Sequence, residues 1–231
     1  MTDSVALLLK ELRLPAFHRH YQSLWETAIE KNWSHTDYLA ALCEYELSDR
    51  YQRRTQKWLR EAKLAANKTF SALDQSGFSR PCNAALAKLQ QDSDWAHHAD
   101  NVLLIGPSGT GKTHIANALG HQLTEQGVRC KLFPAIALVQ HLQQAKRDLD
   151  LMTAMTRLDK YRVIIIDDIG YVKKTDAETQ VLFEFIAHRY ESGSLIVTAN
   201  QPFSEWDQIF PDSMMTVAAV DRLIHHATII E

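Results

Sequence analysis

Cysteine, net basic charge and long apolar runs are all scarce in this chain, and each scarcity excludes a class of protein. The 231 residues include three widely spaced cysteines and no Cys-x-x-Cys pair. We therefore expect free thiols in a reducing compartment, not a disulfide framework. No apolar run reaches membrane-spanning length, and the first residues lack the basic start of a signal peptide. A cytoplasmic protein with no membrane partner is the expectation.

The charges nearly balance, so overall charge does not indicate nucleic acid. There are 25 Lys and Arg against 28 Asp and Glu, for a net charge of −3, and any nucleic-acid site must be local. The hydrophobic fraction of 45% allows a real core. Adjacent histidines occur as His97-His98 and His225-His226. We expect these to be solvated surface residues, because no cysteine or acidic ligand lies nearby at metal spacing.

One glycine-rich stretch organises the rest of the chain. It fits the pattern G-x-x-x-x-G-K-[ST] at every fixed position. A short apolar run at 101–105 precedes it, and apolar residues at helical spacing follow it as far as Gly127, a predicted helix C-cap. Strand, turn and helix are the context that a phosphate-binding loop needs. The predicted nucleotide-binding residues are Gly106, Pro107, Ser108, Gly109, Thr110, Gly111, Lys112 and Thr113.

The residue types in this loop indicate how it would hold a nucleoside triphosphate. Its glycines let the backbone turn N–H groups toward phosphates, and the helix N-terminus adds partial positive charge. Lys112 is predicted to reach the β- and γ-phosphates, and the Thr113 hydroxyl to bind Mg²⁺. ATP and Mg²⁺ are therefore the expected cofactors.

Polar residues end two further strand-like runs. The run 163–166 is entirely apolar and leads into Asp167 and Asp168, and the run 194–199 leads into Asn200. We expect Asp167 to hold Mg²⁺ and Asp168 to orient or deprotonate an attacking water. Asn200 is expected to contact the γ-phosphate or that water, although an Asx turn before Pro202 would also explain it. Strands that alternate with helices predict a doubly wound parallel sheet, hence an α/β fold.

The first part of the chain is predicted to be helical, with a local concentration of basic residues. Helical spacing covers 4–14 and 17–31, and a capping box at 34–37 opens a third helix. Arg50, Arg53, Arg54 and Lys57 fall on one face of that helix, where few acidic residues accompany them. A phosphate-backbone contact and an ordinary solvated helix face both explain this run.

The composition predicts three segments. Residues 1–70 form a helical N-terminal region, and residues 71–100 form a connecting segment with a short helix at 84–89. Residues 101–231 form the nucleotide-binding domain.

Several motifs together resemble one known family. They are Gly-Pro-Ser-Gly-Thr-Gly-Lys-Thr-His, Ile-Ile-Ile-Asp-Asp-Ile-Gly-Tyr, Thr-Ala-Asn-Gln-Pro-Phe-Ser-Glu-Trp and Asp-Arg-Leu-Ile-His-His. In this combination the chain resembles the IstB family, the ATP-binding transposition helpers of insertion sequences. These are AAA+ ATPases related to the DnaC helicase loaders. The N-terminal Leu-Lys-Glu-Leu-Arg-Leu-Pro and Glu-Tyr-Glu-Leu-Ser-Asp-Arg-Tyr-Gln-Arg-Arg also resemble the family's helical leader, so the match covers nearly the whole chain.

The resemblance implies an AAA+ P-loop fold and a role for each motif. Residues 106–113 would be Walker A, Asp167 and Asp168 Walker B, and Asn200 sensor I. Arg222 matches an arginine finger that acts on ATP held by a neighbouring subunit, so a homo-oligomer is implied. Family members usually continue into a Gly-x-Ser-Tyr-Arg segment that carries sensor II. This chain stops at Glu231, so that segment is expected to be missing.

The expected function follows from the resemblance. It is an ATP-dependent AAA+ ATPase that assembles on duplex DNA and assists the transposase of its insertion sequence. A DnaC-like loader of a replicative helicase is the nearest alternative. A small-molecule kinase and a DNA-binding protein with a vestigial nucleotide site are more distant ones.

Overall fold

Internal contacts divide the chain into two units, Met1–Lys57 and Trp58–Glu231. The computed structural model describes residues 2–171, 176–208 and 213–231. The sequence places domain boundaries at residues 70 and 100, whereas the contacts group residues 58–100 with the nucleotide-binding sheet. Each unit is described by itself.

The first unit consists of helices, as the sequence predicts. They are α1 (Thr2–Glu11), α2 (Pro15–Glu30) and the part of α3 (His35–Ala62) that extends to Lys57. The predicted capping box opens α3: the Asp37 N–H donates to the Ser34 hydroxyl, and the Asp37 carboxylate accepts from the Ser34 N–H, both at 3.1 Å. Pro15 does not end α1 but is the first residue of α2. The first N–H groups of a helix have no acceptor within the helix, so a proline there costs no hydrogen bond.

A buried carboxylate connects α2 to α3. Glu46 of α3 is 4% exposed and accepts a hydrogen bond at 2.8 Å from the backbone N–H of Ala16, in the first turn of α2. That turn has no side-chain cap of its own, so Glu46 supplies the acceptor and the negative charge that a helix N-terminus favours. Burial alone would raise the pKa of Glu46, but hydrogen bonds from Arg50 and the Ala16 backbone outweigh it and hold that pKa below its usual value.

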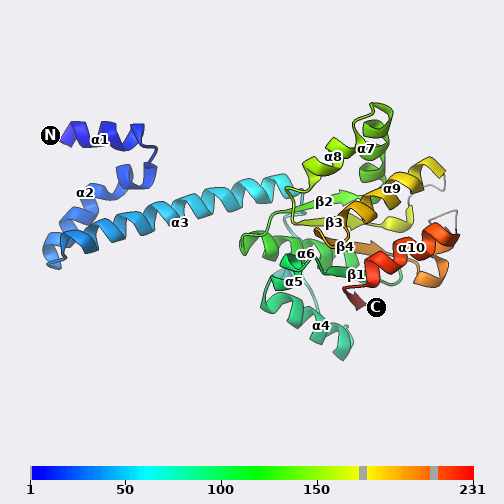
Figure 1. Ribbon diagram of the computed structural model, residues 1–231. Coiled ribbons are helices and arrows are strands. Elements are labelled where there is room, and N and C mark those ends of the chain that lie inside the picture. The colour runs from blue at the N-terminus through cyan, green and yellow to red at the C-terminus, as the bar shows by residue number, and fades with distance from the viewer. Residues whose placement is uncertain (1, 172–175, 209–212) are drawn as a thin grey trace. The chain divides into compact units, whose positions relative to one another are not determined.

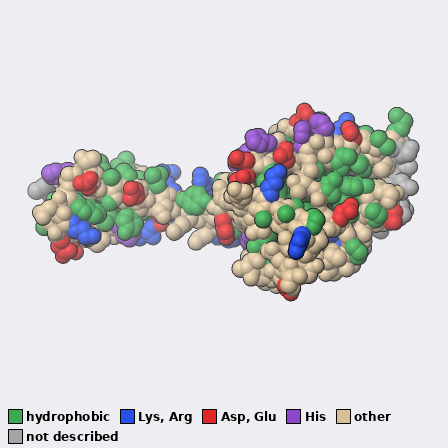
Figure 2. All heavy atoms as spheres, turned by 90° about the horizontal axis from the view of Figure 1, so that it is seen from below, with side chains coloured by type: hydrophobic (Ala, Val, Ile, Leu, Met, Phe, Trp, Pro, Cys, Tyr) green, Lys and Arg blue, Asp and Glu red, His purple; other side chains and the backbone are tan. Residues whose placement is uncertain are grey.

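This unit buries few apolar side chains and exposes many. Ala16, Leu24, Ala28 and Leu42 are buried. Figure 2 shows hydrophobic side chains on the surface of this unit, and those at least 60% exposed are Leu7, Leu12, Ile29 and Leu47. Apolar side chains that form a contiguous exposed patch mark contact surfaces, whereas single ones are normal on a protein surface. In the described part of the chain, no helix combines the length and apolar character needed to cross a membrane.

The second unit contains the predicted parallel sheet. Its strands are β1 (Asn101–Ile105), β2 (Cys130–Pro134), β3 (Val163–Asp167), β4 (Ser194–Ala199) and β5 (Ala227–Ile230). The order is β2-β3-β4-β1-β5, and every neighbouring pair is parallel. Because β4 pairs with both β1 and β3, the carboxyl ends of these three strands share one edge of the sheet.

Helices cover both faces of this sheet, as Figure 1 shows. The helices between and after the strands are α6 (Lys112–Glu125), α7 (Ala135–Arg147), α8 (Leu151–Leu158), α9 (Asp176–Arg189) and α10 (Ser213–Ile224). Side chains alternate along each strand, so Ile164 and Ile166 join a core with α7, α9 and α10, while Val163 and Ile165 join a core with α6. Both faces are therefore dry, which explains the unbroken apolar runs in the strands.

The segment predicted to be a connection is structured and packs on the α6 side of the sheet. It contains η1 (Phe70–Ala72), α4 (Arg80–Gln91) and α5 (Asp94–His97). Leu86 and Leu89 of α4 are buried in the core with α6, and Phe70 and Phe78 pack against it. The predicted short helix at 84–89 is thus the centre of a longer one, which begins at an N-cap, Ser79, whose hydroxyl accepts from the Cys82 N–H.

We predict that Glu46→Gln destabilises the first unit by about 1–3 kcal/mol, because hydrogen bonds to a charged acceptor are lost. The pKa of Glu46 is lowered in the folded state. Its contribution is therefore complete above the unfolded value of about 4.3 and disappears as pH falls through the folded value. Amide hydrogen exchange at Ala16, measured from pH 7 to pH 3, tests this. Exchange should accelerate in the variant at pH 7 and approach the wild-type rate at pH 3. The control is Glu44→Gln, an exposed carboxylate of the same helix, and equal effects of the two substitutions would contradict the cap.

Candidate nucleotide-binding site

The predicted phosphate loop lies between buried β1 and the first residue of α6. Gly106, Gly109 and Gly111 all have positive φ angles, of 150°, 87° and 92°. A side chain is strained in that region of backbone space, so glycine permits the turn that directs N–H groups inward. Residues 107–110 are exposed, and Lys112 is the first residue of α6. The loop therefore presents its backbone at a helix N-terminus, the geometry that binds anions.

Lys112 spans its own loop. Its side chain is 9% exposed, and Nζ donates to the carbonyl oxygen of Pro107 at 2.7 Å. The Thr110 hydroxyl donates to the same carbonyl at 2.9 Å. The ammonium is thus held over the concave side of the loop. A bound phosphate would take the place of the neutral Pro107 carbonyl as its hydrogen-bond acceptor, and a charged acceptor binds an ammonium more strongly.

Asp167 connects the phosphate loop to two strands. Its Oδ1 accepts hydrogen bonds from the Thr113 hydroxyl at 2.9 Å and from the Thr198 hydroxyl at 2.7 Å. Thr113 belongs to α6 and Thr198 to β4, so three elements meet at one oxygen. The structure brings the two predicted metal ligands, Thr113 and Asp167, into contact. The sequence did not predict a role for Thr198, because this residue lies within an apolar run that is typical of a buried strand.

Asp168 leaves the strand in a strained conformation. Its φ is 58°, in the left-handed region, and its N–H donates to the Thr198 hydroxyl at 2.7 Å. Burial and then the charge of Asp167 raise the pKa of Asp168, while Lys112 and Lys68 act in the opposite direction. A carboxylate with a raised pKa is a candidate functional group.

Asn200 follows β4 at the same edge of the sheet. Its Oδ1 is buried and has no hydrogen-bond partner among the described residues. A Cβ on Gly170 would lie 2.6 Å from that oxygen, so a larger residue at 170 would require the Asn200 amide to move. An orphaned acceptor of this kind is satisfied by a donor such as water. The structure therefore places Asn200 at the shared carboxyl edge with Asp167 and Asp168, as the sequence predicts.

A hollow of about 290 Å³ lies beside the loop. Its walls include Phe78, Ser79 and Cys82 from the segment before β1, together with Lys112, Ile115 and Ile230. Phe78 also packs on Gly111, whose Cβ would lie 3.6 Å from the ring. The sequence did not predict this hollow, because residues 71–100 have the pattern of a connecting segment. The sequence feature that indicates it is Phe78, an aromatic residue within a polar stretch.

Arg222 lies at the opposite edge of the sheet from the phosphate loop. The carbonyl of its neighbour Leu223 accepts a 3.0 Å hydrogen bond from the side chain of Asn101, the first residue of β1. The loop begins one strand length away, roughly 13 Å at 3.3 Å per residue. The guanidinium donates to the Ala218 carbonyl at 2.8 Å and lies over the Phe183 ring. The structure thus does not bring Arg222 to the phosphate loop of its own chain.

The predicted DNA-contact residues lie on α3 in the first unit, and two of them are paired with acids. Arg50 donates to Glu46 at 2.9 Å, and Arg53 contacts Asp49 at 2.6 Å. Arg54 lies over the Tyr51 ring at 5.4 Å. The premise that acidic partners are nearly absent was wrong, because Glu46 lies just before the basic run and Asp49 begins it. The side chains of Arg50 and Arg53 nevertheless remain more than half exposed.

Comparison with known families identifies this constellation. The family model for IstB-like ATP-binding proteins matches residues 7–231. The chain belongs to the IstB-like ATP-binding family. A putative insertion sequence ATP-binding protein of Sinorhizobium fredii is 42% identical over 98% of this chain and 76% of its own length. The insertion sequence IS21 putative ATP-binding protein of Pseudomonas aeruginosa is 34% identical over 96% of this chain and 83% of its own.

Solved structures support the AAA+ P-loop fold of this IstB-like protein. A crystal structure of the DnaC helicase loader superimposes with a TM-score of 0.57 at 18% identity, covering 72% of this chain and 98% of that one. AMPPCP-bound DnaA from Aquifex aeolicus gives 0.60 at 15% identity, covering 73% of this chain and 51% of that one. At these identities the likeness extends to the fold alone.

The residues present fit ATP with Mg²⁺. The loop offers turned backbone N–H groups, Lys112 lies over it, and the Thr113 hydroxyl and Asp167 carboxylate form an oxygen donor set. Oxygen donors of this kind suit Mg²⁺, which in nucleotide sites is held by one or two protein oxygens and phosphates. The orphaned Asn200 oxygen leaves an acceptor for a water at the same edge. The residues at this edge of the IstB-like chain therefore fit the phosphates of ATP and a Mg²⁺ ion.

We predict that Asp168→Asn stabilises the nucleotide-free protein, raising Tm by about 1–3 °C at pH 7. The pKa of Asp168 is raised, so its ionised form destabilises the folded state above that pKa. Protonation removes the penalty, and the two proteins should converge below about pH 4. Asp167→Asn makes the same chemical change one residue earlier but weakens the acceptor of two hydroxyls, and should lower Tm. Calorimetry of both variants tests this, and a lower Tm for Asp168→Asn would contradict the assignment.

Proposed function

We propose that this protein is a Mg²⁺-dependent ATPase that oligomerises through its nucleotide, binds duplex DNA and assists the transposase of an insertion sequence. The observation that carries the proposal is the carboxyl edge, where Asp167 joins Thr113 and Asp168 lies beside Asn200's strand. Its relatives are described as insertion sequence ATP-binding proteins, which motivates the transposase as partner.

In the proposed hydrolysis, the protein acts by positioning the reacting groups and by stabilising their charges. Asp168 would accept the proton of the attacking water, and the unsatisfied Asn200 oxygen would accept a second hydrogen bond from it and fix its direction. Mg²⁺ would neutralise charge on the phosphates. Lys112 would move its ammonium from the Pro107 carbonyl to the phosphate oxygens. The hollow at Phe78 is the proposed place of the adenine ring, since it is apolar, adjoins the loop and has an aromatic wall.

The position of Arg222 favours catalysis between subunits. It lies at the amino edge of the sheet beside Asn101, away from its own loop. Arg222 and Asp221 line a hollow of about 480 Å³ with Tyr190, Met214 and Val217. Met214 and Val217 are 80% and 69% exposed. A cationic group within an exposed apolar patch is suited to a neighbouring chain, where the guanidinium would leave the Ala218 carbonyl for the transferring phosphoryl group.

We predict that Lys112→Ala and Arg222→Ala are each nearly inactive but complement one another when mixed. Lys112→Ala lacks productive ATP binding, whereas Arg222→Ala binds ATP and hydrolyses it ~10³–10⁵ times more slowly. Mixed assemblies contain some interfaces in which the Arg222→Ala subunit supplies an intact phosphate loop and the Lys112→Ala subunit supplies an intact Arg222. Steady-state ATPase at fixed total protein, across mixing ratios with duplex DNA present, should therefore exceed the sum of the separate activities.

The control for this experiment is Arg157→Ala, which removes an exposed arginine paired with Asp150 and should retain wild-type activity. Strictly additive activity in samples shown to co-assemble would rule out a finger in trans. The same assay with and without DNA separates the other candidates. A kinase requires an acceptor, and a vestigial site hydrolyses nothing.

DNA binding is proposed for the basic face of α3. Arg54 and Lys57 extend this face beyond the two arginines that pair with Glu46 and Asp49. The side chains of Arg50 and Arg53 are more than half exposed, so phosphates can approach them although Glu46 and Asp49 already pair with them. We expect all four side chains to contribute to neutralising phosphates.

We predict that Arg54→Ala/Lys57→Ala weakens duplex binding and flattens the plot of log K against log salt by about 1.8, or 0.9 per phosphate. Arg50→Ala/Arg53→Ala should flatten it by at most the same amount, because these side chains also neutralise carboxylates. Fluorescence anisotropy with a labelled duplex, from 50 to 200 mM salt, measures the slopes. Lys10→Ala/Lys31→Ala removes the same charge elsewhere in the unit and is the matched control. Equal slopes for wild type and Arg54→Ala/Lys57→Ala would leave α3 as a solvated face.

The nearest alternative is a replicative helicase loader, which the DnaC-like fold favours. Either partner would need a docking surface, and the exposed leucines of the first unit are suited to one. Pull-down with purified transposase or purified helicase distinguishes them.

A further inference from the structure

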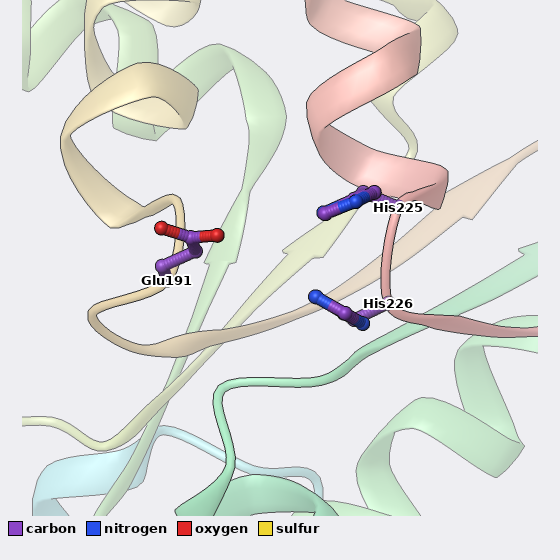
Figure 3. A group of neighbouring side chains, drawn as sticks. All are labelled: Glu191, His225 and His226. Carbon is purple, nitrogen blue, oxygen red and sulfur yellow. The ribbon is translucent and has the colours of Figure 1, made fainter.

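Two turns that are distant in the sequence meet at the amino edge of the sheet. Glu191 lies between α9 and β4, while His225 and His226 lie between α10 and β5. Figure 3 shows the three side chains around a common space between these turns. One ligand atom from each residue lies within 4.8 Å of the other two. The sequence predicts that His225 and His226 are solvated, because their acidic neighbour, Glu191, comes from a different part of the chain.

Two imidazoles and a carboxylate are a donor set that suits zinc. Zn²⁺ binds His nitrogen and Glu oxygen at about 2.0–2.2 Å in tetrahedral sites, which puts donor atoms roughly 3.3 Å apart. All three side chains are exposed, so small rotations can bring the donors from 4.8 Å or less to this separation. Mg²⁺ prefers an all-oxygen octahedral shell and is disfavoured here.

Neighbouring groups support a cation at this place. The Tyr190 hydroxyl lies 2.8 Å from Nδ1 of His225. With Nδ1 protonated and donating to Tyr190, Nε2 is the nitrogen that has a lone pair for a metal, and such contacts orient metal-binding histidines. Two helices, α9 and α10, also end here, and helix C-termini carry partial negative charge.

We propose that Glu191, His225 and His226 form a zinc-type transition-metal site, separate from the nucleotide site at the opposite edge of the sheet. A bound ion would join the turn after α9 to the end of α10, the helix that contains Arg222. Water would complete the coordination, because the site is open to solvent. The proposal does not depend on ATP hydrolysis or DNA binding.

The test is isothermal titration of the full-length, metal-free protein with zinc chloride at pH 7.5, without nucleotide and without a polyhistidine tag. We expect one Zn²⁺ per chain and a higher Tm in its presence. Glu191→Gln, His225→Asn and His226→Asn should each weaken binding at least tenfold, and Tyr190→Phe about tenfold through loss of the orienting contact. Magnesium chloride should give no binding at this site.

The matched control is His97→Asn/His98→Asn, which removes an exposed histidine pair of the same unit that has no third ligand in the described structure. This variant should keep one Zn²⁺ per chain. ATP binding and circular dichroism, which should be unchanged in all variants, verify that each one is folded. Zinc binding that survives Glu191→Gln and His225→Asn, or that is lost in the control, would overturn the proposal. Absence of zinc binding to the wild type would overturn it as well.

Discussion

The nucleotide site depends on one oxygen of the Asp167 carboxylate, which accepts from the hydroxyls of Thr113 and Thr198. This contact requires the strand order, because only a sheet with β4 between β1 and β3 brings the three elements to one edge. Two short hydrogen bonds hold the carboxylate in place before any ligand arrives. Groups that are already oriented need little rearrangement on binding, and preorganisation of this kind is the main source of electrostatic catalysis.

The same sheet separates two sets of polar groups. Its carboxyl edge carries the phosphate loop, Asp168 and Asn200, whereas its amino edge carries Arg222 and the cluster of Glu191, His225 and His226. The strands between them have mostly apolar side chains on both faces, and buried polar residues such as Thr198 and Asn101 are hydrogen-bonded. Arg222 therefore lies away from the carboxyl edge of its own chain, and α10 connects it to the turn that contains His225 and His226.

The first unit is organised differently, because it has few buried apolar residues. Polar contacts define its turns: Ser34 and Asp37 begin α3, and Glu46 caps α2 while holding Arg50. The same carboxylate thus stabilises the fold and partly neutralises the proposed DNA-contact face. The exposed leucines of α1 contribute little to the core of this unit and are available to a partner.

The sequence by itself determined the local features of this protein. The phosphate loop, the strand that ends in Asp167 and Asp168, the helix cap at Ser34 and the parallel α/β class all follow from residue spacing within short windows, where periodicity and turn chemistry act. Only the tertiary structure decided which distant groups meet. Thr198 joins Asp167, Glu46 caps α2, Phe78 forms a wall beside the loop, and Glu191 joins the histidine pair. Each of these pairings depends on strand order or helix packing, which no short window of sequence contains, because hydrophobic burial that drives the packing is not directional.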